Sequence, residues 1–388
     1  MGTCYTSEIP RFRIISPVLY AAWIAIGLAP MEREIRYDTF RVRLMLCQGR
    51  KSVLRSTIWL LITALLIAML SYINDNWNFR EWDLALVAYM FQKWMGRTSL
   101  LLTYWICATT GLRHLRSFIR ALRFADHCLS ENDVQYWKKA LGNIVLVIYC
   151  VIMSSILVSA QKRYREIYSR LILIVVVFFK TLVTLQFVFL VLELRERFRS
   201  VNASLRELLP PLSVPELRAV FGEDFWGVSP RAASGRLRQL REAYVVLTHA
   251  AETLQQHCGP PLALNIACCV GAATFYAYGM LSSAGRQLSP YQWAGTTALW
   301  LANHSFRLVA MSLACAAAAD AAADTGPLLL RASAVCDWRD PELDAFMQLT
   351  LRGPPLCFTA AGLVVVDRRL LVSALAVVVS YLVVLGQQ

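Results

Sequence analysis

Residues 369–386 read RLLVSALAVVVSYLVVLG, and this stretch decides the fold class because its only charged residue is the first one. A membrane core of about 30 Å requires roughly 20 apolar residues per helix. Six other stretches are comparably long and apolar, so we expect an all-α, polytopic bundle of seven membrane-spanning helices. The predicted spans are Val53–Ile73, Leu84–Thr110, Leu141–Ser159, Ser169–Leu192, Leu262–Ala284, Trp293–Ala316 and Arg369–Gly386.

The composition of the whole chain supports this interpretation. Of its 388 residues, 57% are hydrophobic and only 17% are charged, whereas soluble domains carry about 25% charged residues. This excludes an ordinary soluble enzyme and a disordered chain. The net charge of +13 does not indicate nucleic acid here, because in membrane proteins such an excess marks cytoplasmic loops.

The positions of the cations predict the orientation in the membrane. Of the 39 Lys and Arg residues, 26 lie in the alternate segments 1–52, 111–140, 193–261 and 317–367, and five lie in the loops between them. The amino terminus is therefore expected in the cytoplasm and the carboxyl terminus outside a cell membrane. Rhodopsin-like receptors have the opposite orientation, and their Asp-Arg-Tyr and Asn-Pro-x-x-Tyr motifs are missing from the third and seventh spans.

An eighth apolar run, Ile14–Ala29, is too short for an ordinary span and contains Pro17. We interpret it as an interfacial helix, with a further span or a signal peptide as alternatives.

The long segments between spans predict a cytoplasmic helical region. Leu194, Phe198, Val201 and Leu205 continue a helical stripe beyond the fourth span, and a second stripe runs from Leu237 to Leu254. Such stripes bury against each other, within one subunit or between subunits. The predicted organisation is a cytoplasmic segment with an interfacial helix (1–52), spans one to four (53–192), a cytoplasmic helical extension or anchor region (193–261), spans five and six (262–316), a cytoplasmic anchor segment (317–367) and a pore-lining span (368–388).

Residues 317–367 also predict smaller elements. Leu343, Phe346 and Met347 indicate a short helix, and Cys357–Val366 indicates a strand or a segment entering the core.

The sequence contains no signature of catalysis. Walker, His-Glu-x-x-His, Gly-x-Ser-x-Gly and dinucleotide motifs are missing, and the 11 cysteines show no zinc-like spacing. Asn303-His304 is the one pair compatible with a membrane-bound acyltransferase, although a buried, hydrogen-bonded pair is commoner. We therefore predict no enzyme activity, no catalytic residue, no metal site and no cofactor.

Cations, aromatic residues and polar residues gather in the predicted outer halves of the spans, which contain no Asp or Glu. Interfacial belts of Trp and Tyr and snorkelling cations are one explanation. A ligand cavity with apolar walls and a few polar groups is the other. The candidate ligand-binding residues are Gln92, Lys93, Ser155, Lys180, Tyr276, Tyr278 and Trp300.

The last span carries a narrow polar stripe. Ser373, Ser380 and Gln387 are seven residues apart, with Val377 and Val384 between them. Such a stripe suits an aqueous lumen shared by several copies around an axis. Serines that bond their own i−4 carbonyls are the alternative.

Here the sequence resembles the insect gustatory receptors. The end, Ser380-Tyr381-Leu382-Val383-Val384-Leu385-Gly386-Gln387-Gln388, is similar to the family's Thr-Tyr, five apolar residues, Gln-Phe signature. Phe358-Thr359-Ala360-Ala361-Gly362 resembles its Phe-x-Ala-x-Gly, and Asp367 with Leu370-Leu371 and Ser373 its next segment. Asn202 with Leu205, and Asp324-Thr325 with Leu328-Leu329, resemble upstream stretches.

Two departures from the signature are evident. Ser380 replaces Thr, and Gln388 replaces the Phe that completes the outer constriction in that family. The second change puts the tightness of the closed pore in doubt, or indicates a carboxyl-terminal truncation.

The resemblance implies a gustatory receptor: a tastant-gated, non-selective cation channel with the lipid bilayer as its environment. Small-molecule tastants would bind within each subunit, and monovalent and divalent cations would permeate a homotetramer or a heteromer with related receptors. The implied pore and gate residues are Ser373, Val377, Ser380, Tyr381, Val384, Gln387 and Gln388. A membrane transporter or membrane-bound transferase is the alternative, although the inverted repeats and paired broken spans of transporters are not evident.

Overall fold

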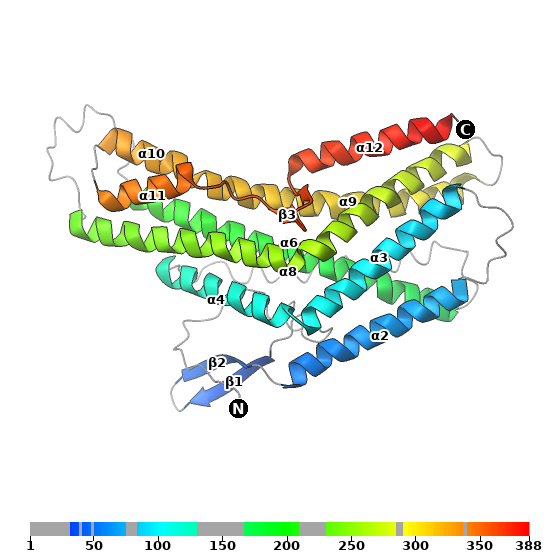
Figure 1. Ribbon diagram of the computed structural model, residues 1–388, viewed down its shortest axis with the longest axis horizontal. Coiled ribbons are helices and arrows are strands. Elements are labelled where there is room, and N and C mark those ends of the chain that lie inside the picture. Colours follow the sequence, from blue (N-terminus) through cyan, green and yellow to red (C-terminus); the bar gives the residue numbers. More distant parts are fainter. Residues whose placement is uncertain are drawn as a thin grey trace.

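A computed structural model describes residues 32–38, 41–47, 50–74, 84–129, 167–208, 230–284, 290–336 and 340–387. These ranges are mostly helical and form an elongated bundle (Figure 1). The helices are α2 (Arg50–Asn74), α3 (Leu84–Ala108), α4 (Gly111–Leu129), α6 (Ile167–Leu208), α8 (Pro230–Ala284), α9 (Pro290–Ala323), α10 (Thr325–Cys336), α11 (Pro341–Arg352) and α12 (Arg368–Gly386), and the strands are β1 (Glu32–Asp38), β2 (Arg41–Cys47), β3 (Thr359–Ala360) and β4 (Val364–Val365).

Six predicted spans lie on described helices, namely α2, α3, α6, α8, α9 and α12. The span Leu141–Ser159 and the interfacial helix Ile14–Ala29 lie outside the described residues. Among the residues with described side chains, three helices are long and apolar enough to cross a membrane: Ile174–Leu208, Ser234–Leu281 and Thr297–Ser333. The helical fold expected from the sequence is thus confirmed for the part of the chain that the structure covers.

Helix α2 has the surface expected of a helix in lipid. Leu54, Leu61 and Leu65 are more than half exposed, which water would disfavour for so long a row of leucines. On its other side, Trp59 packs edge-on against Phe179 of α6, with ring centroids 5.2 Å apart.

Helices α6, α8 and α9 are longer than a bilayer requires, with 42, 55 and 34 residues. They run from the end of the molecule that holds α2, α3 and α12 into the end that holds α4, α10 and α11 (Figure 1). They pass without interruption through the domain boundaries predicted at 192/193, 261/262 and 316/317, so those boundaries are not breaks in secondary structure. Their relation to the membrane surface stays a prediction.

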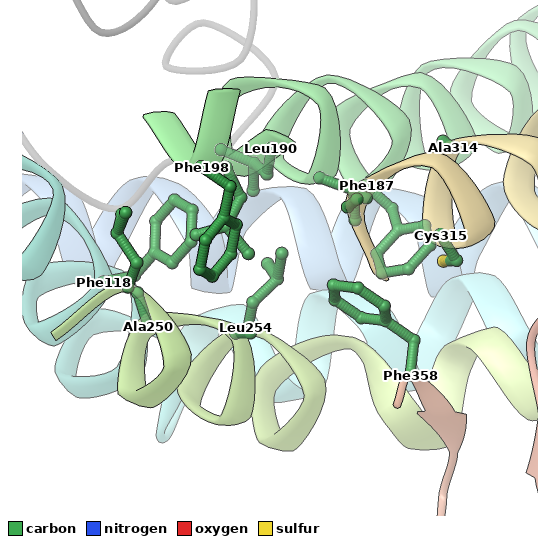
Figure 2. Close-up of a cluster of buried hydrophobic side chains, with 14 of the residues drawn as sticks. Phe118, Phe187, Leu190, Phe198, Ala250, Leu254, Ala314, Cys315 and Phe358 are labelled. Atoms are coloured by element: carbon green, nitrogen blue, oxygen red, sulfur yellow. The ribbon is translucent and has the colours of Figure 1, made fainter. Parts of the chain in front are cut away.

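The two predicted stripes are buried in the second of these ends. Leu194, Phe198 and Val201 of α6 are inaccessible, as are Leu240 and Leu247 of α8. Tyr244 joins the helices, since its ring meets Phe198 edge-on at 5.5 Å and Phe346 of α11 at 5.6 Å. Figure 2 shows Phe198, Phe118, Ala250 and Leu254 converging in this core. The stripes therefore pack within one subunit, which was one of the two alternatives.

Helix α4 was not anticipated from the sequence. Leu115, Phe118, Ile119 and Leu122 recur at helical spacing and are all buried, mainly against α8. Arginines at 113, 116, 120 and 123 occupy other positions of the helix. The apolar residues therefore form no long continuous run that would predict a span.

An ion-pair network ties α4 to α6. Arg197 binds Asp126 through Nε and Nη2 at 2.7 and 3.0 Å, and its Nη1 lies 2.9 Å from Glu193. Burial would lower the pKa of Arg197, but the two carboxylates outweigh it and raise that pKa above its usual value. The guanidinium is therefore charged at any physiological pH.

Helix α8 changes direction near the middle of its length (Figure 1). Pro260 and Pro261 lie there, and each proline removes a backbone hydrogen bond and kinks a helix. The hydroxyl of Ser99 on α3 donates to the Pro261 carbonyl at 3.0 Å. The bend is thereby held against α3.

Asn202 of α6 closes the junction between α9 and α10. Its amide donates to the Ala321 carbonyl at 2.7 Å, and its side-chain oxygen accepts from the Thr325 hydroxyl at 2.7 Å. Ala321 lies in the last turn of α9, where carbonyls lack helical partners. Asn202 is 4% exposed, so this buried side chain links the last turn of α9 to the first residue of α10.

Strands β1 and β2 form an antiparallel hairpin in which Ile35 pairs with Leu44 and Glu32 with Cys47. From the sequence, this stretch was assigned to the cytoplasmic amino-terminal segment without any predicted strand, so the hairpin is an addition to the prediction.

Candidate ligand site and pore helix

Three aromatic rings stack between α8 and α9. The Tyr276 ring lies 6.0 Å from the rings of Trp300 and His304, which are 6.1 Å from each other, and the interplanar angles are 16° to 26°. Trp300 and His304 share a face of α9 because they are four residues apart. Val177 of α6 packs with Trp300 on the same side of the bundle.

Trp300 and His304 of this stack are buried together with their ring nitrogens. Trp300 is 9% and His304 is 5% exposed. The indole Nε1 and both imidazole nitrogens make no hydrogen bond to any described residue. Buried polar atoms are nearly always hydrogen-bonded, so these nitrogens are where a bound molecule or water is expected.

A buried cation lies one turn further along α9. Arg307, 5% exposed, donates through Nε and Nη2 to the Thr184 hydroxyl at 3.2 and 3.1 Å, and Nη2 also donates to the Asn265 side-chain oxygen. The Asn265 amide donates to Thr184 at 3.2 Å and to the Met311 sulfur at 3.4 Å. These partners fix the guanidinium, but all of them are neutral.

A second cation, Lys180, points from α6 toward α3. Its ammonium occupies the space where Gly96 lacks a side chain, since a Cβ there would collide with it. It lies within electrostatic range of Arg307 and Arg97, and Arg97 lies over the Trp94 ring at 5.5 Å. The predicted spans contain no Asp or Glu. A charge at membrane depth costs about 2.5–3.5 kcal/mol, so this concentration of positive charge is a costly feature.

A small cavity lies next to the Arg307 network, at the bend of α8. It offers about 30 Å³ to water-sized molecules, enough for one or two. Its wall is formed by Thr103, Ile106, Val183, Thr184, Gln186, Phe187, His257, Cys258, Pro261, Leu262, Asn265 and Met311. Thr184 and Asn265 line this cavity and are also the hydrogen-bond partners of Arg307. A change in the occupancy of the cavity would therefore alter the position of the guanidinium.

The β3–β4 hairpin docks beside that bend. Leu363 N donates to the Ala360 carbonyl at 3.0 Å across a turn in which Ala361 and Gly362 have φ values of 54° and 72°. A Cβ on Gly259 would lie 3.1 Å from Ala361 N. The turn therefore packs directly against the backbone of α8, where a side chain would crowd it. The Gln255 amide also donates to the Thr359 hydroxyl.

The hairpin places one aromatic side chain in the core. Phe358 is 3% exposed, and Figure 2 shows its ring directed toward Phe187 and Cys315. Ala360 is inaccessible. The segment Cys357–Val366 therefore forms strands and also enters the core, which were the two expectations. Phe358 and Ala360 are buried, and Gly362 adopts a positive φ in the turn.

Helix α12 follows directly from this hairpin. Asp367 caps it by accepting from the Arg369 and Leu370 amides at 2.8 and 3.1 Å, and Arg368 pairs with Asp320 of α9 at 2.6 Å. The helix lies at the edge of the bundle (Figure 1), on α8 and α9, and Ala374 is buried there.

Much of the remaining surface of α12 is exposed. The predicted pore residues Ser373, Val377, Ser380, Tyr381, Val384 and Gln387 are all exposed, and Gln388 lies outside the described residues. Ser380 donates to the Ala376 carbonyl at 2.8 Å. A hydrogen bond from a serine to its own i−4 carbonyl was the expected alternative to a stripe that faces a pore. In this helix Ser380 makes that bond and is also exposed.

The predicted ligand residues fall into three groups. Lys180, Tyr276 and Trp300 lie in the same region, beside Arg307 and His304. Tyr278 is half-buried, but two residues beyond Tyr276 it lies about 200° around the helix. Ser155 and the side chains of Gln92 and Lys93 lie outside what the structure describes.

The residues predicted from the sequence for this site did not include His304, Arg307, Thr184 or Asn265. Arg307 could have been found as a cation in a span without any acid. His304 was considered as a catalytic group or as part of a buried structural pair, but not as a ligand contact, although it follows Trp300 by one turn. Nothing in the sequence distinguishes Thr184 or Asn265 from ordinary buried polar residues.

Long apolar helices with a buried polar cluster among them are typical of a helical membrane protein. The family model described as 7tm Chemosensory receptor matches residues 15–388. The chain therefore belongs to the seven-transmembrane chemosensory receptor family.

Solved structures of the same fold are insect olfactory receptors. The receptor OR5 from Machilis hrabei is 13% identical, with a TM-score of 0.57 over 94% of this chain and 95% of that one. Its complex with eugenol gives 14% identity and a TM-score of 0.56 over 95% and 97%. At these identities the likeness shows the fold alone. No curated protein matches the sequence.

Proposed function

We propose that the chain is a gustatory receptor that acts as a tastant-gated, non-selective cation channel. Four copies would surround a pore lined by α12, with the amino terminus in the cytoplasm and the carboxyl terminus outside the cell membrane. The observation that carries the proposal is the exposed stripe Ser373, Val377, Ser380, Val384 and Gln387 on an otherwise apolar terminal helix. One such stripe cannot enclose a pore, but a symmetric ring of stripes can.

The ligand would bind at the aromatic and cationic site described above. Buried polar atoms without partners beside aromatic rings are typical of small-molecule sites. The solved OR5 complex with eugenol is a precedent for a small molecule bound to a protein of this fold.

The path from ligand to pore would run through α8 and the β3–β4 hairpin. Tyr276 lies on α8 beyond its proline bend, and Gly259 lies just before that bend against Ala361. From the hairpin, the chain enters α12 at Arg368, three residues after Val365. A shift of α8 at the bend would therefore reach the first turn of α12.

The experiment is whole-cell recording from cells that express the full chain, during application of a panel of sugars, bitter compounds and dissolved carbon dioxide. A receptor channel gives a ligand-evoked current that reverses near 0 mV in mixed monovalent and divalent cations. Ligand-evoked uptake without a current that scales with driving force would instead support the transporter alternative. Covalent conversion of an applied compound would support the transferase alternative.

A further inference from the structure

We propose that the buried site between α3, α6, α8 and α9 binds the carboxylate of a small aromatic acid. Lys180 and Arg307 would supply the opposite charge, and the rings of Tyr276, Trp300 and His304 would lie beside the aromatic group. This inference rests on the proposed receptor function and specifies the chemical class of its ligand.

The first argument is charge balance. Lys180 and Arg307 lie within electrostatic range of each other. The predicted spans contain no Asp or Glu. Like charges repel strongly where the dielectric constant is low, and buried charges are normally paired. An anion is the missing component that would make this arrangement favourable.

The second argument is the geometry of Arg307. Thr184 and Asn265 hold its Nε and Nη2 in place without neutralising the charge. Its Nη1 has no hydrogen-bond partner among the described residues. A guanidinium fixed by neutral groups is preorganised for a carboxylate, which matches its planar set of donors better than other anions of similar size.

The third argument concerns the aromatic part of the ligand. His304 lies one turn before Arg307 and within electrostatic range of both Arg307 and Lys180. It is stacked with Trp300 and Tyr276, and the nitrogens of Trp300 and His304 have no partners among the described residues. A flat ring bearing a carboxylate would pack on this stack, whereas a halide ion would leave it unused.

The test uses the full chain purified in detergent, with sodium benzoate as the probe at pH 7.4. Benzamide has the same ring and nearly the same shape but no charge, and sodium chloride at equal concentration controls for halide binding. The melting temperature is measured as each concentration rises, because a ligand that binds the native state raises it.

The variants separate the charges from general damage to the fold. Lys180→Met removes one positive charge. It breaks no hydrogen bond, because the Lys180 ammonium makes none with the described residues. Arg307→Gln removes the other cation and disturbs Thr184 and Asn265. Arg331→Gln, an exposed position on α10, is the matched control. If Arg307→Gln does not fold, Lys180→Met decides alone.

Benzoate should raise the melting temperature of the wild type and of Arg331→Gln, and benzamide and chloride should not. Lys180→Met should weaken the benzoate effect about tenfold or more in concentration, while its melting temperature without ligand stays the same or rises. Equal stabilisation by benzamide, equal stabilisation by chloride, or unchanged benzoate binding to Lys180→Met would each overturn the proposal.

Current recording distinguishes this inference from the proposed function. Charge-dependent binding of benzoate without any current would support the acid site and count against the receptor channel. A current evoked by neutral tastants in a chain that does not bind benzoate would support the channel and reject the acid site.

Discussion

The guanidinium of Arg368 lies 2.6 Å from the carboxylate of Asp320, so the first turn of α12 is fastened to α9 by a single ion pair. Both side chains are more than half exposed, at 66% and 55%. Exposed pairs contribute only about 0–1 kcal/mol to stability. The pair nevertheless connects the proposed pore helix to the helix that carries Trp300, His304 and Arg307, so its effect should be on opening rather than on folding.

Asp320→Asn should therefore leave the melting temperature unchanged while shifting the ligand concentration for half-maximal current severalfold. The exchange Asp320→Arg with Arg368→Asp should restore the wild-type value, because the pair forms in either direction. Dose–response curves of the three channels provide the measurement. Identical curves for wild type and Asp320→Asn would show that the pair does not take part in opening.

The Arg197 network should matter far more for stability. Arg197→Met leaves Asp126 and Glu193 without their shared partner, and breaking a buried pair in this way costs roughly 3 kcal/mol. The two carboxylates are partly exposed, at 32% and 20%, so water limits the loss to the lower part of the usual range. Denaturant unfolding in detergent measures it.

Arg199→Met is the matched control, because Arg199 makes only an exposed pair with Glu196 at 3.5 Å. Its effect should stay within about 0.5 kcal/mol. Equal destabilisation by the two substitutions would mean that the buried network has no special role in joining α4 to α6.

The turn of the β3–β4 hairpin contains a correctable strain. Ala361 has a φ of 54°, a conformation that costs a residue with a Cβ about 1 kcal/mol relative to glycine. Ala361→Gly should therefore stabilise the protein slightly or leave it unchanged. Ala360→Gly, one residue earlier in the buried strand β3, should destabilise it. Thermal unfolding of both variants is decisive, and a loss of stability in Ala361→Gly would show that its methyl group has a packing role.

Much of the fold followed from apolar patterns alone. The predicted spans on described residues are helical because long apolar runs leave no other way to satisfy the backbone in a membrane. The stripes after the fourth span and before the fifth were also predictable, since residues such as Phe198 and Leu240 recur at helical spacing. Helix α4 was not, because arginines interrupt its short apolar face.

The candidate site was only partly predictable. Tyr276, Trp300 and Lys180 were found because aromatic, polar and cationic residues gather in the predicted outer halves of the spans. Their closeness to Asn265 and Thr184 depends on how α6, α8 and α9 cross, and a single sequence does not contain this information. Gly259 is similar, since only the docked hairpin explains why a side chain is missing there.

The predicted orientation can be tested without any ligand. Epitope tags placed after Met1 and in the segment 209–229 should be inaccessible to antibodies on intact cells and accessible after permeabilisation. The physical reason is the concentration of Lys and Arg in the segments that contain both sites. Labelling of either tag on intact cells would reverse the orientation, and the outer half of the bundle would then be the half assigned here to the inside.

The last prediction concerns the end of α12. Gln387 ends the exposed stripe with Ser373 and Ser380, so in a ring of four subunits its amides would face the axis and line the narrowest point. Gln387→Ala should change single-channel conductance, because it replaces a polar wall group. Leu375→Ala is the control, since Leu375 is 64% exposed but lies about 120° around the helix from Gln387. It should leave conductance unchanged.

Gln388→Phe should lower the current measured without ligand, since an apolar ring excludes water from a constriction better than an amide does. Equal basal current in wild type and Gln388→Phe would place the closed gate deeper, at Val384 or Ser380. Equal conductance in wild type and Gln387→Ala would remove α12 as the lining of the pore.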